Sequence, residues 1–195
     1  MEIYNAIRSQ ILQKLGIDLS KDLFYHSPQH TIDVALQAER IARMELIETP
    51  EEFFLLKVAS LYHDSGFLST YTEHEAAGCI LAKKDLPRFG LNRTQVDIIC
   101  RLIMATKIPQ TPRTRLEEII CDADLDYLGR DDFPEISNNL FLELKGRRLV
   151  ETKNEWNSIQ IKFFHQHHYF TKTNKELRQP QKLHHLEMIE SSLSR

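Results

Sequence analysis

The pair His63 and Asp64 places two ionisable side chains at the end of the most apolar helical stretch of the chain, residues 53–62. With nine histidines among 195 residues, a His-Asp dipeptide carries little information by itself. Its setting carries more, because an ionisable group beside buried apolar sequence is costly unless it is paired, hydrogen-bonded or bound to a metal ion. Gly66 follows and lets the backbone turn away. The pair is therefore a candidate for metal binding or catalysis.

Two other places in the chain offer the same kinds of ligand. His26 and His30 are four residues apart around Pro28, which predicts that a helix begins between them. Asp122 and Asp124 close another apolar helical stretch. Imidazole nitrogens and carboxylate oxygens at the ends of buried helices, brought to one point, would form a mixed nitrogen and oxygen site for a divalent cation.

Each of these residues also has a structural interpretation when it is taken alone. His26 or His30 could cap a helix, His63 could be a hydrogen-bonded core histidine, and Asp122 and Asp124 could be surface acids. The joint pattern favours a metal site, because every one of these side chains lies next to apolar sequence.

Helical spacing of apolar residues extends over nearly the whole chain, and no alternating strand pattern of useful length is present. Capping-box patterns at Thr72, Thr114 and Thr152 predict three helix starts, and Gly16 predicts the end of the first helix. The fold class is therefore all-α, with about eight or nine helices forming a bundle.

The length predicts one globule with two parts. We expect a helical core over residues 1–150 and a C-terminal helical extension, residues 151–195, packed on the same globule. The boundary is placed near Gly146, where the helical pattern is interrupted.

Composition excludes several classes of function. The formal net charge is −3, so nucleic acid held through its phosphates is not expected. No apolar run approaches the roughly 20 residues that span a bilayer, and the N-terminus lacks a secretion signal, so we expect a cytoplasmic protein without a membrane partner. The three cysteines, Cys79, Cys100 and Cys121, are expected to be buried free thiols.

Four segments together resemble the HD-domain superfamily of metal-dependent phosphohydrolases. They are YHSPQHTIDV at 25–34, LYHDSG at 61–66, HEAAG at 74–78 and DADLDYLG at 122–129. The resemblance covers roughly residues 20–145. It implies a helical bundle of the HD-domain type, and it is specific for the superfamily but not for the substrate.

The resemblance implies a set of metal ligands in this chain. His30, His63, Asp64 and Asp124 match the pattern of His, His-Asp and Asp, and Asp122 is the alternative for the last position. Such ligands suit Mn, Fe, Co, Ni or Zn, with Mg as a further candidate. We expect one tightly bound ion, because the stretch where two-metal members carry a further histidine contains none here.

The resemblance also implies catalytic and substrate-binding residues. Asp64 would orient the attacking water as well as bind metal, and His26 would protonate the leaving oxygen; its alternative role is positioning or capping. Lys107 could offer a positive charge to the phosphate or be a solvated helix end. Arg130 could face substrate or belong to a capping loop. His74 is the candidate for a second metal site.

The function implied is hydrolysis of a phosphomonoester or phosphodiester, of a nucleotide or cyclic nucleotide, by a metal-bound hydroxide. The alternative is a non-catalytic module of the same family that binds a nucleotide or metal for regulation. The expected partner is a small-molecule phosphoester, and a homodimer stays open.

Overall fold

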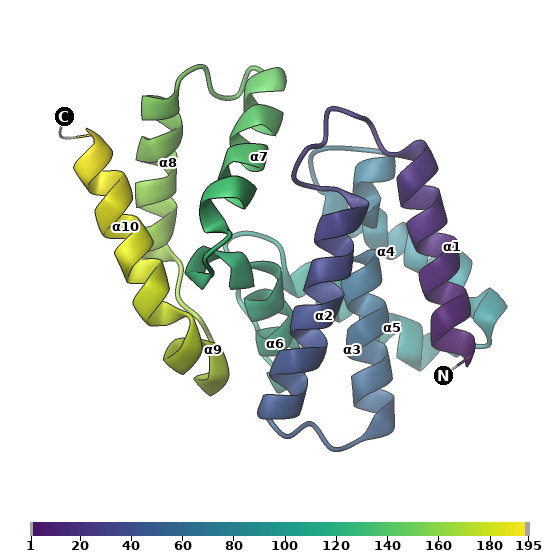
Figure 1. The fold of residues 1–195 in the computed structure, drawn as a ribbon. Helices are drawn as coiled ribbons and strands as arrows, with labels where there is room; N and C mark the ends of the chain where they lie inside the picture. The colour runs from purple at the N-terminus through teal and green to yellow at the C-terminus, as the bar shows by residue number, and fades with distance from the viewer. Residues whose placement is uncertain (1, 194–195) are drawn as a thin grey trace.

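The computed structural model describes residues 2–193 and contains only helices and connecting loops in this range (Figure 1). The prediction of an all-α fold is confirmed, and nine of the ten α-helices have at least seven residues. The α-helices are α1 (Glu2–Asp18), α2 (Pro28–Met44), α3 (Pro50–Tyr62), α4 (His74–Asp85), α5 (Arg93–Ala105), α6 (Arg115–Asp124), α7 (Phe133–Gly146), α8 (Lys153–Gln166), α9 (Lys172–Leu177) and α10 (Gln179–Leu193). Three short 3₁₀ helices join them: η1 (Ser65–Leu68), η2 (Leu86–Phe89) and η3 (Asp126–Gly129).

The helix starts follow the capping signals in two of three cases. Thr152 forms a complete capping box at α8, and the Thr114 hydroxyl accepts from the third residue of α6. The prediction for Thr72 is wrong: Glu73, in the left-handed backbone region at φ 55°, precedes α4 without a side-chain cap. The end predicted at Gly16 is also short of the observed one, because α1 continues through it to Asp18.

The first core surrounds α3, which packs against α1, α2, α5 and α6. Its apolar residues are buried on several sides of the helix, as the sequence predicts for the most apolar segment. The helix therefore presents its C-terminal end to the interior of the protein. That end carries His63 and Asp64, which are both buried.

A second core joins the C-terminal helices to this bundle. Leu128 of η3, Phe133 of α7, Phe164 of α8 and Leu186 of α10 form a buried apolar cluster, together with Tyr25 just before α2. In Figure 1, α7, α8 and α10 lie together on one side of the bundle formed by α1 to α6. The start of α2 is thus covered by residues from the last third of the chain.

The most apolar helix, α3, has 13 residues and carries Glu51 and Glu52 in its first turn. Among the described residues, no helix combines the length and apolar character needed to cross a membrane. Cys79, Cys100 and Cys121 are free and buried, as predicted.

Candidate metal centre

Three helix ends bring their ionisable side chains to one point. His30 comes from the first turn of α2, His63 follows α3, and Asp124 ends α6. Their candidate ligand atoms all lie within 4.8 Å of one another. The Asp124 Oδ1 atom is 3.2 Å from His30 Nε2 and 3.4 Å from His63 Nε2, and the two Nε2 atoms are 3.4 Å apart. Two imidazoles and a carboxylate converging in this way can hold a divalent cation.

Asp64 contributes a fourth ligand atom at the same point. Its Oδ2 atom lies 3.2 Å from His63 Nε2 and 3.4 Å from His30 Nε2. This oxygen is fully buried and has no hydrogen-bond partner among the described residues. A buried carboxylate oxygen without a donor is costly, and a cation removes that cost. The residues present therefore fit a metal ion.

The backbone fixes the orientation of His63. Its Nδ1 atom lies 2.8 Å from the carbonyl oxygen of Ser60, which is free to accept because α3 ends there. Nδ1 therefore carries the hydrogen and donates it, and the lone pair of Nε2 points toward His30 and Asp124. Metal-binding histidines are held in this way by a bond from their other ring nitrogen.

The charges of the cluster favour a cation. Burial alone would raise the pKa of Asp124, but the adjacent imidazoles of His30 and His63 lower it to about 2. Burial would likewise raise the pKa of Asp64, and the neighbouring His63 and His74 hold it well below its usual value. Both carboxylates are therefore ionised near neutral pH, as metal ligands must be.

Asp122, the alternative for the last ligand, points elsewhere. Its Oδ1 accepts from the backbone N–H of Phe170 at 2.8 Å, and its Oδ2 accepts from the N–H and hydroxyl of Thr171 at 2.9 and 2.6 Å. Burial raises the pKa of Asp122 to about 6. The structure therefore brings Asp124 to the cluster, and Asp122 ties α6 to the segment before α9.

His26 is held beside the cluster by a residue that sequence reasoning missed, Glu143. Glu143 of α7 is fully buried, and its Oε1 lies 2.5 Å from His26 Nδ1 and 3.1 Å from the Tyr71 hydroxyl. Its Oε2 accepts from the backbone N–H groups of Tyr25 and His26. Burial would raise the pKa of Glu143, but these bonds lower it. Its only signal in the sequence is an acid among the apolar residues of α7.

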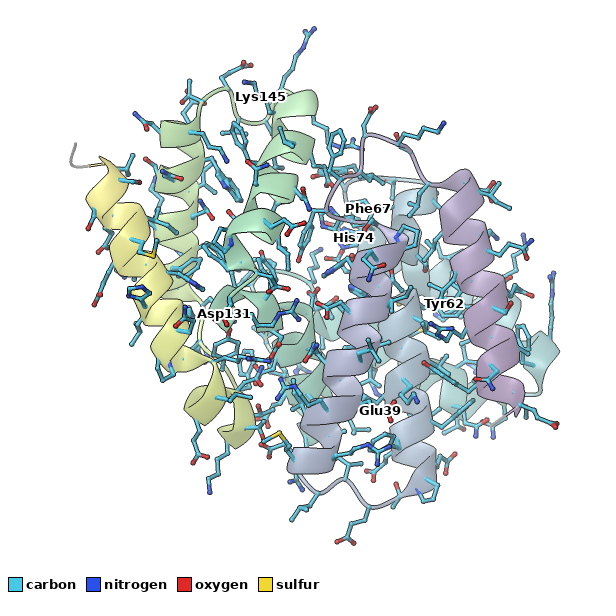
Figure 2. All side chains as sticks on the ribbon, viewed as in Figure 1. Glu39, Tyr62, Phe67, His74, Asp131 and Lys145 are labelled. Atoms are coloured by element: carbon cyan, nitrogen blue, oxygen red, sulfur yellow. The ribbon has the colours of Figure 1, made fainter. Side chains whose placement is uncertain are left out.

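Aromatic stacking holds His26 and His74 against the same ring, and their own centroids are 6.1 Å apart. Phe67 stacks on His26 and on His74, with ring centroids 4.1 Å apart in each case. Figure 2 labels Phe67 and His74 close together near the start of α2. The Nε2 atom of His74 is 3.4 Å from Asp64 Oδ1, on the opposite carboxylate oxygen from the one that faces His30. His74 therefore borders the cluster without joining it.

Gly66 allows the close approach that positions His74. A Cβ atom at Gly66 would overlap the carbonyl oxygen of His74 and lie 2.8 Å from the backbone nitrogen of Gly78. The backbone of η1 thus packs directly on α4. The predicted turn after the His-Asp pair serves this contact.

The two cations predicted to bind substrate are engaged with acids in this structure. The Lys107 Nζ atom lies 2.5 Å from Glu73 Oε2, and both side chains are exposed. Arg130 binds Asp33 at 2.8 Å and Asp132 at 2.6 Å. Their contact with substrate stays a prediction.

A cavity of about 310 Å³ opens beside the cluster. His26, Asp64, His74 and Asp124 line one part of it, and apolar residues of α7 and α8 line another. A wider groove of about 790 Å³ between α4 and α5 contains none of the candidate metal ligands. The smaller cavity reaches the cluster from the side of Asp64 and Asp124, and a third cavity, of about 360 Å³, is lined by His30 and Arg130.

Comparison with known proteins identifies a family and a solved structure that this chain resembles. The family model of the HD domain matches residues 29–126, half of the chain. The crystal structure of Bacillus subtilis YpgQ in complex with ADP superposes with a TM-score of 0.64 at 18% sequence identity, covering 96% of this chain and 94% of that one. A search of curated protein sequences finds no match. The fold is thus shared over nearly the full length of both chains.

Proposed function

Because this chain belongs to the HD-domain family, we propose that it is a metal-dependent phosphohydrolase that cleaves a phosphomonoester or phosphodiester bond of a nucleotide or cyclic nucleotide. The observation that carries the proposal is the convergence of His30, His63, Asp64 and Asp124, with a buried carboxylate oxygen left unpartnered among the described residues. The ADP in the B. subtilis YpgQ structure supports a nucleotide as ligand.

In this proposal His30, His63, Asp64 and Asp124 would hold one divalent cation. Two imidazoles and two carboxylates suit Mn, Fe, Co, Ni or Zn better than Mg. When bound, such an ion neutralises charge on the phosphoryl group and makes a water molecule acidic enough to attack near neutral pH. The open sides of the cluster face the cavity, so water and a phosphoryl oxygen can approach from there.

Asp64 would orient the attacking water, and His26 would donate a proton to the leaving oxygen. Asp64 directs Oδ2 to the cluster and Oδ1 toward His74, so it can accept a hydrogen bond from the attacking water and fix its direction. Glu143 holds His26 through Nδ1, which leaves Nε2 as the ring atom free to meet substrate. A positioned imidazolium at the leaving oxygen contributes about 10²–10⁴-fold to a rate.

The test is a hydrolysis screen of the purified protein with Mn²⁺, Co²⁺, Ni²⁺, Zn²⁺ and Mg²⁺. The substrates are nucleoside monophosphates, cyclic nucleotides and nitrophenyl phosphoesters. We expect turnover that disappears in Asp64→Ala while helical circular dichroism is unchanged. Asp131→Asn, which removes an exposed carboxylate outside the cluster, is the matched control and should keep full activity.

The same screen separates the enzyme from the regulatory alternative. A protein that binds nucleotide and metal with measurable affinity but hydrolyses none of these esters would be the non-catalytic module. Equal turnover by Asp64→Ala and the wild type would remove Asp64 from the proposed mechanism.

A further inference from the structure

One side of the cavity beside the cluster is lined by apolar side chains, whereas the ionisable residues of the cluster line another side. Three side chains of α8 form the apolar side: Trp156, Ile159 and Phe163, called the α8 wall below. Leu140 of α7 extends it. The wall lies in the same cavity as the ligand atoms of Asp64 and Asp124. A molecule whose phosphoryl group reaches the cluster through this cavity can place its organic group beside the α8 wall.

The polar side-chain atoms around Trp156 form hydrogen bonds with one another. The indole N–H of Trp156 donates to Ser137 Oγ at 3.2 Å, and the Ser137 hydroxyl donates to Gln160 Oε1 at 2.6 Å. Gln160 Nε2 donates in turn to Asn157 Oδ1 at 3.2 Å. A ligand group that competed for these atoms would leave a buried partner unsatisfied. Trp156, Ile159 and Phe163 therefore offer apolar contact and no free donor, whereas Gln160, which also lines the cavity, keeps one amide N–H beyond its bond to Asn157.

The charges around the cavity lead to the same conclusion. Among the described residues, its lining contains Asp64, Glu75 and Asp124 but no lysine or arginine. The nearby cations Lys107 and Arg130 are bound to acids outside the cavity. Apart from the metal and the imidazoles of His26 and His74, which would meet the phosphoryl end, the cavity offers the organic group mainly apolar surface to bury.

We propose that the α8 wall determines specificity and selects phosphoesters whose organic group carries an aromatic ring. This inference rests on the proposed function and adds a substrate class to it. The ring lies against Trp156, Ile159 and Phe163 and is recognised by its shape and apolar faces, which suits cavity sites lined mainly by hydrophobic side chains. Phosphorylated sugars and polyols, which need hydrogen-bond partners, bind more weakly. Bases of equal size are not distinguished.

The binding test uses phosphonates, which the enzyme does not cleave. Trp156 is the single tryptophan of the chain, so its fluorescence reports on the wall directly. With Mn²⁺ present, phenylphosphonate should change this fluorescence saturably and bind more than about tenfold tighter than methylphosphonate, which carries the same anion without the ring. Equal affinities would overturn the assignment of the wall.

A second comparison uses natural ester chemistry. AMP and ribose 5-phosphate share the same phosphate and sugar, and only AMP has an aromatic base. AMP should have the lower KM by more than about tenfold, whereas AMP and GMP should differ by less than about threefold. Ribose 5-phosphate used as well as AMP, or a large preference between the two purines, would contradict recognition by apolar contact.

Two variants test whether the α8 wall causes the difference in affinity between the two phosphonates. Ile159 is 45% exposed at α8, so Ile159→Ala should fold, and it should weaken phenylphosphonate binding by about three- to tenfold without affecting methylphosphonate. Leu142→Ala removes a similarly exposed side chain of α7 that does not line the cavity, and it should change neither affinity. Identical behaviour of the two variants would overturn the proposal.

The outcomes also distinguish this inference from the proposed function. Binding of phenylphosphonate through the wall, with no hydrolysis of any ester, would refute the enzyme and leave the wall in place. Efficient hydrolysis with sugar phosphates preferred would refute the wall and leave the enzyme in place.

Discussion

Glu143→Gln is the substitution that most sharply tests how His26 is used. The change keeps the shape of a fully buried side chain and replaces one acceptor oxygen with an amino group. The backbone N–H groups of Tyr25 and His26 need an acceptor, so the amide oxygen stays on their side. The new amino group then faces His26 Nδ1 and the Tyr71 hydroxyl. His26 must accept at Nδ1, and it loses the anion that held it as a proton donor.

The size of the effect follows from the contacts. A hydrogen bond to a charged group contributes about 1.5–3 kcal/mol, and we expect a loss of unfolding free energy in that range. A positioned general acid contributes about 10²–10⁴-fold, so kcat for an ester with a poor leaving group should fall by about 10²-fold or more. Glu143 acts through His26, so it is a positioning residue.

The assay compares two leaving groups. AMP releases an alkoxide that needs a proton, whereas p-nitrophenyl phosphate releases a phenolate that does not. Glu143→Gln should slow the first reaction strongly and the second little, and adding His26→Gln should cost little more because the two residues act as a unit. Glu135→Gln on the exposed side of α7 is the control. Equal slowing of both substrates, or additive losses, would refute this role.

Three further results are expected. Gly66→Ala should lower the unfolding free energy by about 3 kcal/mol in urea titrations, because its Cβ would overlap the carbonyl oxygen of His74. Gly16→Ala is the control and should not destabilise the protein, because the space around Gly16 is open. An unchanged unfolding free energy in Gly66→Ala would contradict the packing of η1 on α4. Burial lowers the pKa of Lys182 to about 8, so the unfolded chain binds more protons between about pH 8 and 10.5. The unfolding free energy should therefore rise with pH over that window, and Lys182→Met should remove the rise. An unchanged pH dependence of the unfolding free energy in Lys182→Met would show that another group causes the rise. Saturating Mn²⁺ at about 100 times its Kd should raise Tm by about 5–10 °C in the wild type and not in Asp64→Asn, and equal shifts would place the ion at another site.

Local signals in the sequence predicted most of the helices, because helix caps and apolar periodicity act within a few residues. Thr152 and Thr114 cap helices as their patterns indicate. Thr72 does not, because a residue in the left-handed region precedes α4 and changes the direction of the chain. The local pattern contains no information on that backbone conformation.

Ionisable residues beside apolar sequence indicated which side chains could be ligands, and the resemblance to HD domains put Asp124 before Asp122. Apolar patterning alone could not make that choice, because the contacts that turn Asp122 away come from Phe170 and Thr171, nearly 50 positions further along the chain. Glu143 was missed for the same reason: its partner His26 lies 117 residues away, and an acid on a helix resembles a solvent-facing one. The α8 wall likewise exists only once the C-terminal helices have packed.

The central claim is that one divalent cation binds where α2, α3 and α6 meet. Anomalous diffraction from crystals grown with Mn²⁺ tests it most directly. The account predicts one strong peak within about 2.0–2.3 Å of ligand atoms from His30, His63, Asp64 and Asp124. A peak bound by other residues, or none at this point under conditions that support activity, would contradict it.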